Sequence, residues 1–309
     1  MTNQILGLHH ITAIANEAKK NLEFYTKILG LRLVKKTVNF DDPGTYHFYY
    51  GDEVGTPGTI LTFFPWEGIG KGKNGTGLAT HTAFSIDKES YNFWKARLEA
   101  YDIAFKEEII FKEKCLSFED YDGLQLRLVI AKNKDNRQGW QTNHIDKNMA
   151  IKGFHNVTLT LKELGATARI LCGILGYRLM EIENNAYRFV TDTVANANAI
   201  DIIVDEHMPP GLNAAGTNHH IAFRVENDEI MAYFQQKVLG AGLHITHKIN
   251  RDYFYAMYFR EPGGVLFEIS SNNPGFTVDE PLAELGQSLK LPEQYEAYRD
   301  KIENILPKL

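Results

Sequence analysis

The stretch Gly7-Leu-His-His-Ile-Thr-Ala is repeated, with changes, as Gly153-Phe-His-Asn-Val-Thr-Leu, 146 residues further along the chain. A second stretch, Lys27-Ile-Leu-Gly-Leu-Arg-Leu, is repeated at the same spacing as Gly173-Ile-Leu-Gly-Tyr-Arg-Leu. Two matches at one spacing, with no gap between them, are hard to obtain by chance. The sequence therefore indicates an internal duplication, and the duplicated unit decides the fold.

A further pair of repeats lies between these motifs. Thr80-His-Thr-Ala-Phe resembles His219-His-Ile-Ala-Phe at an offset of 139 residues, and Asp122-Gly-Leu-Gln-Leu-Arg resembles Gly263-Gly-Val-Leu-Phe-Glu at an offset of 141. The two offsets differ by two residues, which a loop insertion of that length explains. The chain thus consists of four modules, which begin near residues 7, 78, 153 and 217.

Each module shows the same order of elements. A short apolar or alternating strand opens it, at residues 10–14, 81–86, 156–161 and 220–225. An amphipathic helix follows, as where Tyr91, Trp94 and Leu98 fall on one helical face, and three strands close the unit. We predict an α+β fold in which four βαβββ modules pair into two open barrel-like sheets, with a C-terminal helical tail.

The length of 309 residues predicts about two domains at roughly 150 residues each. We expect an N-terminal domain at 1–148 (modules 7–66 and 78–132) and a C-terminal domain at 149–275 (modules 153–206 and 217–272). The remaining residues, 276–309, form a tail in which Pro292 opens a helix. Four side chains on one face of that helix would cover apolar surface: Tyr295, Tyr298, Ile302 and Ile305.

Composition narrows the class of protein. A net charge of −6 argues against a nucleic-acid or anionic-membrane surface, and no apolar run approaches the roughly 20 residues that a membrane-spanning helix needs. The N-terminus lacks the pattern of a secretory signal. Two cysteines, Cys115 and Cys172, cannot form a disulfide framework and match no metal motif. These features favour a globular protein of the cytoplasm.

The modules differ at equivalent strand positions, and these differences point to chemistry. The first strands carry His10, His81, Asn156 and His220 at the equivalent place. The last strands carry Thr62 in module one, Arg127 in module two and Glu268 in module four, whereas module three cannot be aligned there. Only module four therefore offers both a first-strand histidine and a last-strand carboxylate.

Two neutral imidazoles and one carboxylate on one face suit Fe(II), with coordination positions left for substrate and O2. Mn(II) fits the same set, and Zn(II) fits it less naturally. His220 and Glu268 supply two of the three ligands, and His10 and His81 are both candidates for the third. Glu268 lies in an apolar strand, where an unpaired carboxylate would cost several kcal/mol. Arg127 would serve no metal, which favours a metal-free pocket around His81.

With these motifs established, the chain resembles the vicinal oxygen chelate superfamily of glyoxalase, bleomycin-resistance and extradiol dioxygenase proteins. Within it, the chain is most similar to the dioxygenases that open the ring of hydroquinone and chlorinated hydroquinones. The resemblance covers nearly the whole chain and includes His47-Phe-Tyr-Tyr-Gly-Asp-Glu-Val-Gly-Thr-Pro-Gly-Thr, Asn218-His-His-Ile-Ala-Phe, Arg260-Glu-Pro-Gly-Gly-Val-Leu-Phe-Glu and Gly275-Phe-Thr-Val-Asp-Glu.

The resemblance implies a set of site residues. The metal ligands of the family fall on the second histidine of each pair, His10 and His220, and on Glu268. The residues around these ligands fall on five positions: His9, Thr12, His219, Arg251 and Tyr258. The family often has glycine after the arginine, where this chain has Asp252. Strand alternation would point His9 and His219 away from the ligand side, so we expect them to orient ligands or relay protons.

The resemblance also implies a function. We expect an Fe(II)-dependent, extradiol-type ring-cleaving dioxygenase that acts on hydroquinone or a substituted hydroquinone, with Mn(II) as an alternative metal. The partners would be the aromatic diol and O2, and a homo-oligomer stays open. A catechol dioxygenase, a glyoxalase-like enzyme or a metal-free binding or resistance protein are the alternatives. Because three ligands must reach one ion, modules one and four should share a barrel, and modules two and three should form the other.

Overall fold

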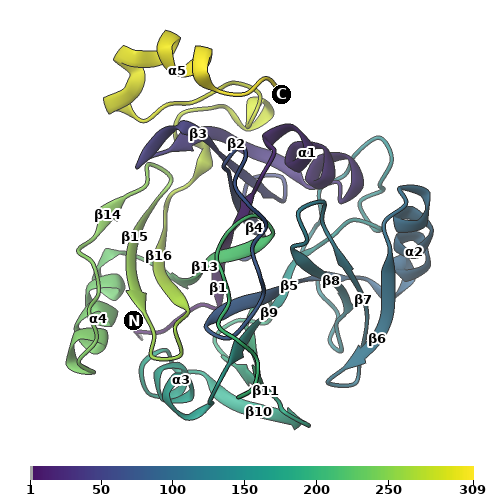
Figure 1. The fold of residues 1–309 in the computed structure, drawn as a ribbon, viewed down its shortest axis with the longest axis vertical. Helices are drawn as coiled ribbons and strands as arrows, with labels where there is room; N and C mark the ends of the chain where they lie inside the picture. The colour runs from purple at the N-terminus through teal and green to yellow at the C-terminus, as the bar shows by residue number, and fades with distance from the viewer. Residues whose placement is uncertain (1–2) are drawn as a thin grey trace.

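The computed structural model describes residues 3–309, which form two curled sheets of eight strands each (Figure 1). The first sheet has the strand order β14-β15-β16-β13-β1-β4-β3-β2, so it combines the fourth module with the first. The second sheet has the order β10-β11-β12-β9-β5-β8-β7-β6 and combines the third module with the second. The predicted α+β fold and the predicted crosswise pairing of modules are both confirmed.

The strands of the first sheet come from the two ends of the chain: β1 (Leu8–Ala15), β2 (Arg32–Asn39), β3 (Asp42–Gly51), β4 (Ile60–Pro65), β13 (Thr217–Val225), β14 (Ile249–Asn250), β15 (Phe254–Arg260) and β16 (Leu266–Pro274). The strands of the second sheet come from the middle: β5 (Leu78–Ile86), β6 (Phe105–Ile110), β7 (Glu113–Glu119), β8 (Gln125–Ile130), β9 (Gly153–Leu161), β10 (Arg178–Glu183), β11 (Ala186–Val190) and β12 (Ala199–Val204).

Each sheet has the same internal symmetry. The first strands of the paired modules lie antiparallel at the centre, β1 against β13 and β5 against β9. On its other side each central strand pairs in parallel with the last strand of its own module, as β1 does with β4 and β13 with β16. The last strands therefore flank the centre, and side chains from all four strands converge on one face.

A helix follows the first strand of each module. These helices are α1 (Ala18–Glu23), α2 (Tyr91–Ala100), α3 (Gly165–Arg169) and α4 (Asp228–Gly240), and α1 and α3 continue into π-helical turns at Phe24–Ile28 and Ile170–Ile174. The apolar face predicted for α2 is confirmed, because Tyr91, Trp94 and Leu98 are buried. Within residues 3–309, no helix combines the length and apolar character that crossing a bilayer requires.

The C-terminal tail lies against the first sheet, beside β2 and β3 (Figure 1). Pro292 precedes a 3-10 helix at Glu293–Tyr298, which leads into α5 (Arg299–Ile305). Ile302 is buried, as predicted. The predictions for Tyr298 and Ile305 were wrong, since the exposed fraction is 60% for Tyr298 and 58% for Ile305. The tighter 3-10 turns rotate the successive side chains by more than an α-helix would, so the four residues do not share one face.

Candidate metal centre

Three side chains converge on the inner face of the first sheet. His10 projects from β1, His220 from β13 and Glu268 from β16, and all three are buried. The Nε2 atoms of the two histidines are 3.3 Å apart. Glu268 Oε2 lies 3.3 Å from Nε2 of His10 and 2.9 Å from Nε2 of His220. The structure thus brings together one candidate ligand atom from each of these residues.

The donor set fits a divalent cation. Glu268 Oε2 is buried and accepts no hydrogen bond of good geometry, whereas Glu268 Oε1 accepts one from Ser270 Oγ at 2.5 Å. Ligand atoms about 2.1 Å from one ion and at right angles to each other are about 3.0 Å apart. The three separations are close to that value, which is the geometry of a facial set with further positions open.

The expected orientation of His9 and His219 was wrong, because both residues lie in β-bulges. The pairing of β1 with β13 skips His9 between Leu8 and His10, and it skips His219 opposite Thr12 and Ala13. A bulge breaks strand alternation and turns a side chain toward its neighbour. As a result, Nδ1 of His9 lies 2.9 Å from Nδ1 of His10, and Nδ1 of His219 lies 2.8 Å from Nδ1 of His220.

This contact has a consequence for the inner nitrogens. When the Nδ1 of a ligand histidine carries the proton and donates it to the neighbouring imidazole, its Nε2 presents a lone pair. In that tautomer the Nε2 lone pairs of His10 and His220 would face the Glu268 carboxylate, an arrangement that a cation can bridge. Metal-ligating histidines are oriented by partners of their outer nitrogen in the same way.

Burial and mutual contacts shift the pKa values of several groups in the cluster. Burial lowers the pKa of His220, although the Glu268 carboxylate opposes this shift. Burial and the adjacent His220 lower the pKa of His219 to about 3. Burial alone would raise the pKa of Glu268, but His10 and His220 hold it well below its usual range. Neutral imidazoles around an ionised carboxylate are the protonation states that bind a cation.

A cavity of about 370 Å³ is lined by two of the three candidate ligands, His10 and His220. Arg251, Tyr258, Thr12 and His219 line it together with His10 and His220, whereas His9 lies behind the ligands. Arg251 Nε donates to the Tyr258 hydroxyl at 3.3 Å, and burial together with Glu268 raises the pKa of Tyr258. Asp252, which replaces the usual glycine, adopts a positive φ of 61°. Aspartate tolerates this conformation better than most residues do.

Two further residues of the cavity were not predicted from the sequence, His47 and Tyr49 on β3. Nδ1 of His47 lies 2.9 Å from the Tyr49 hydroxyl, and Nε2 lies 3.0 Å from Oγ1 of Thr62. Thr62 in turn shares a 2.8 Å hydrogen bond with Thr12. The two-residue spacing of His47 and Tyr49 on a strand is the signal that could have identified them, since it places both on one face.

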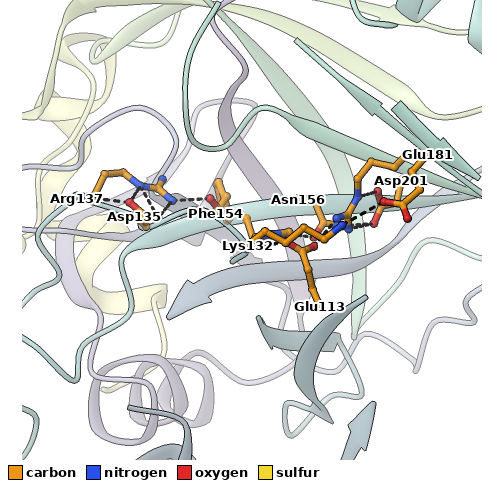
Figure 2. A network of polar contacts seen from close by, with 10 residues as sticks. Glu113, Lys132, Asp135, Arg137, Phe154, Asn156, Glu181 and Asp201 are labelled. Atoms are coloured by element: carbon orange, nitrogen blue, oxygen red, sulfur yellow. Dashed lines mark hydrogen bonds and ion pairs between the residues drawn. The ribbon is translucent and has the colours of Figure 1, made fainter. Parts of the chain in front are cut away.

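The register of the second sheet identifies the position that could not be aligned from sequence. Thr62 pairs with Thr12 in the first sheet, and Asp201 pairs with Thr158 in the second, so Asp201 is the counterpart of Thr62 in module three. Asn156 Nδ2 donates to Asp201 Oδ2 at 2.8 Å (Figure 2). His81 lines a separate cavity together with Arg127.

Comparison with known proteins agrees with this architecture. The model of the Glyoxalase/Bleomycin resistance protein/Dioxygenase superfamily matches residues 7–128 and 153–269. A Bacillus subtilis (strain 168) protein named "Putative ring-cleaving dioxygenase MhqE" is 44% identical over 98% of this chain and 99% of its own. The chlorohydroquinone/hydroquinone 1,2-dioxygenase of Sphingobium indicum is 31% identical over 98% of this chain and 96% of its own.

Solved structures give the same result for the fold. A crystal structure described as that of a "putative dioxygenase" from Bacillus subtilis superposes with a TM-score of 0.96 at 39% identity, over 100% of this chain and 98% of the other. Glyoxalase I from Zea mays superposes with a TM-score of 0.63 at 13% identity, over 86% of this chain and 92% of the other. The second match concerns the fold alone.

Proposed function

The chain belongs to the Glyoxalase/Bleomycin resistance protein/Dioxygenase superfamily, and from this premise we propose that it is a ring-cleaving dioxygenase that opens hydroquinone or a substituted hydroquinone. The names of its full-length relatives support the reaction class, and the name of the Sphingobium enzyme supports the substrate class. The observation that carries the proposal is the convergence of His10, His220 and Glu268, two of which, His10 and His220, line a cavity.

We assign the metal to these three residues, with Fe(II) favoured and Mn(II) as the alternative. When bound, such an ion supplies Lewis acidity and open coordination positions for the diol and for O2. The chain itself contributes a narrow, largely buried site. Phe254 packs its ring 4.9 Å from the ring of His10, and Tyr258 lies 5.6 Å from the ring of His220. These aromatic rings hold the ligand side chains and exclude water from them.

Tyr258 and Arg251 would act on the substrate oxygen. Because Arg251 Nε donates to the Tyr258 oxygen, Tyr258 can donate its phenolic proton to a second acceptor, either Glu268 or a substrate oxygen. The raised pKa of Tyr258 keeps that proton in place until a substrate oxygen accepts it. The Arg251 guanidinium, which faces Asp41 at 3.4 Å, adds positive charge where ring opening develops negative charge.

His9, His219 and Thr12 would act in other ways. His9 and His219 accept the outer proton of each ligand histidine and so fix the direction of its Nε2 lone pair. His219 also lines the cavity, so it can exchange a proton with bound substrate through one water. Thr12 positions Thr62 through their shared hydrogen bond.

A glyoxalase-like activity is the alternative that the site disfavours. That chemistry usually needs a second carboxylate, and the position symmetric to Glu268 is occupied by Thr62 on β4. The Thr62 hydroxyl is already bonded to Thr12 and His47. A metal-free binding protein would gain nothing from the buried, unpaired Glu268 oxygen.

The proposal is tested by metal analysis of anaerobically purified protein, followed by O2 uptake with hydroquinone and with catechol. We expect about one iron per chain and uptake that is faster with hydroquinone. Glu268→Ala should lose both the iron and the uptake, whereas Glu303→Ala, which changes an exposed carboxylate on α5, should keep both. Full ring cleavage by Glu268→Ala would reject the ligand assignment. Turnover of catechol alone would reject the substrate class.

A further inference from the structure

The second sheet contains a cavity at the place that corresponds to the metal centre of the first. Glu268 lies beside Ala222 on β13, and Arg127 lies beside Ala83 on β5, so Arg127 is the counterpart of Glu268. His81 is likewise the counterpart of His220 through the 139-residue repeat. Arg127 and His81 both line a cavity of about 830 Å³, which is in the size range of small-molecule sites.

Arg127 is a buried cation that lacks a counter-ion. Only 8% of the residue is exposed, and no carboxylate in residues 3–309 forms an ion pair with it. Its hydrogen bonds are long ones to neutral hydroxyls, 3.4 Å to Ser117 Oγ and 3.3 Å to Thr158 Oγ1. A guanidinium stays protonated even where burial lowers its pKa, as it does here. Burying such a charge without a partner is costly.

Among residues 3–309, the acids near Arg127 form no direct ion pair with it, although Glu108 and Asp201 favour its charge from a distance. Asp201 accepts two hydrogen bonds from Arg188, 2.7 Å from Nε and 2.8 Å from Nη2. Glu113 pairs with the same Arg188 (Figure 2, which labels both acids). Glu108 lines the cavity without reaching Arg127. Arg188 therefore pairs with both acids, and neither of them forms an ion pair with Arg127.

The rest of the cavity wall combines His81 and aromatic side chains with four carboxylates, those of Asp102, Glu108, Glu119 and Asp120. His81 Nδ1 lies 3.1 Å from Thr80 Oγ1, which leaves Nε2 for another partner. Burial and Arg127 lower the pKa of His81 to about 3, so its imidazole is neutral and can donate one hydrogen bond. Phe105 and Tyr121 supply apolar wall. A carboxylate matches the fork of a guanidinium better than a single acceptor does.

We propose that this cavity binds a small aromatic or unsaturated carboxylate, with the carboxylate on Arg127 and His81 and the apolar part against Phe105. The site needs no metal and lies in the other sheet from the proposed ring-cleaving centre. It therefore stands or falls independently of the proposed function.

Calorimetric titration with benzoate tests this proposal, with phenol as the neutral probe of similar shape. We expect benzoate to bind the iron-loaded protein at least tenfold more tightly than phenol does. Arg127→Leu should weaken benzoate binding at least tenfold. Arg178→Leu, which changes an exposed arginine on β10 of the same sheet, should leave it unchanged.

A second variant separates this site from the metal centre, where a carboxylate could also bind. Glu268→Gln should keep the Arg127-dependent benzoate binding, and loss of all binding in that variant would place benzoate at the metal and overturn the proposal. Equal binding of phenol and benzoate would overturn it as well. Should Arg127→Leu fail to fold, Arg127→Lys carries the test, since it keeps the charge but loses the fork and should weaken benzoate binding several-fold.

Discussion

The two sheets share one backbone plan but carry different charges at their equivalent central positions. In the first sheet the central positions carry His10, His220 and Glu268, which present lone pairs and negative charge to a common point. The counterparts in the second sheet are Asn156, His81 and Arg127. The first sheet therefore presents a set of cation ligands, whereas the second places Arg188 in ion pairs and Arg127 beside neutral hydroxyls.

The bulges are common to both sheets, which shows that they belong to the fold rather than to the metal. The pairing of β5 with β9 skips Thr80 and His155, the counterparts of His219 and His9. His155 Nδ1 lies 2.7 Å from Asn156 Oδ1, just as His9 contacts His10. The duplicated modules thus share a β-bulge that turns one side chain toward its neighbour. The residues that the bulge brings into contact differ between the two sheets.

The largest difference between the two sheets is expected when the equivalent residues His10 and Asn156 are each replaced by alanine. His10→Ala removes a proposed ligand, so we expect loss of bound iron and a fall in kcat/KM for hydroquinone of at least about 10³-fold. Asn156→Ala should retain iron and activity. Iron content and O2 uptake of the folded proteins provide the measurement, and equal loss in both variants would contradict the assignment of chemistry to one sheet.

A substitution in the second sheet should change the stability of the protein rather than its activity. Arg188→Met leaves the buried carboxylates of Asp201 and Glu113 without their cation, so we expect a loss of about 3–5 kcal/mol in the free energy of unfolding. Urea denaturation provides the measurement. Iron content per folded molecule should stay at the wild-type value, and a loss below 1 kcal/mol would mean that the network is not a closed charge set.

A pH effect of similar size should come from Asp120, whose carboxylate accepts a 2.9 Å hydrogen bond from the Tyr25 hydroxyl. Burial raises the pKa of Asp120 to about 6, from an ordinary value of 3.8. Between these values the unfolded chain ionises and the folded chain does not, so stability should fall by about 2 kcal/mol as the pH rises from 4 to 6. Asp120→Asn should remove this slope, and an unchanged slope would assign it to other groups.

The smallest effects should come from the two histidines that contact the outer nitrogens of the ligands. His9→Ala and His219→Ala remove the partners of the outer nitrogens, so we expect iron affinity or kcat to fall about 10- to 100-fold. His155→Ala, at the position equivalent to His9, should change neither quantity. Iron titration and steady-state kinetics provide the test, and wild-type values for both His9 and His219 variants would show that the bulged histidines do not orient the ligands.

Much of this protein follows from its sequence alone. The repeats at offsets of 146 and 139 residues determine four modules, because a duplicated strand–helix–strand pattern must fold alike each time. The residue types at equivalent positions were enough to select His220 and Glu268. They also led to the crosswise pairing of modules, since ligands in modules one and four must reach the same ion.

Only the tertiary structure decided the rest, because strand register and bulges depend on contacts between distant parts of the chain. Alternation within one strand predicted that His9 and His219 face away, and the pairing with a strand some 210 residues distant reversed this. The register of β12 against β9 revealed Asp201 as the counterpart of Thr62, which no local motif marks. Local patterns specify what each strand can present, and the partner strand decides where each side chain points.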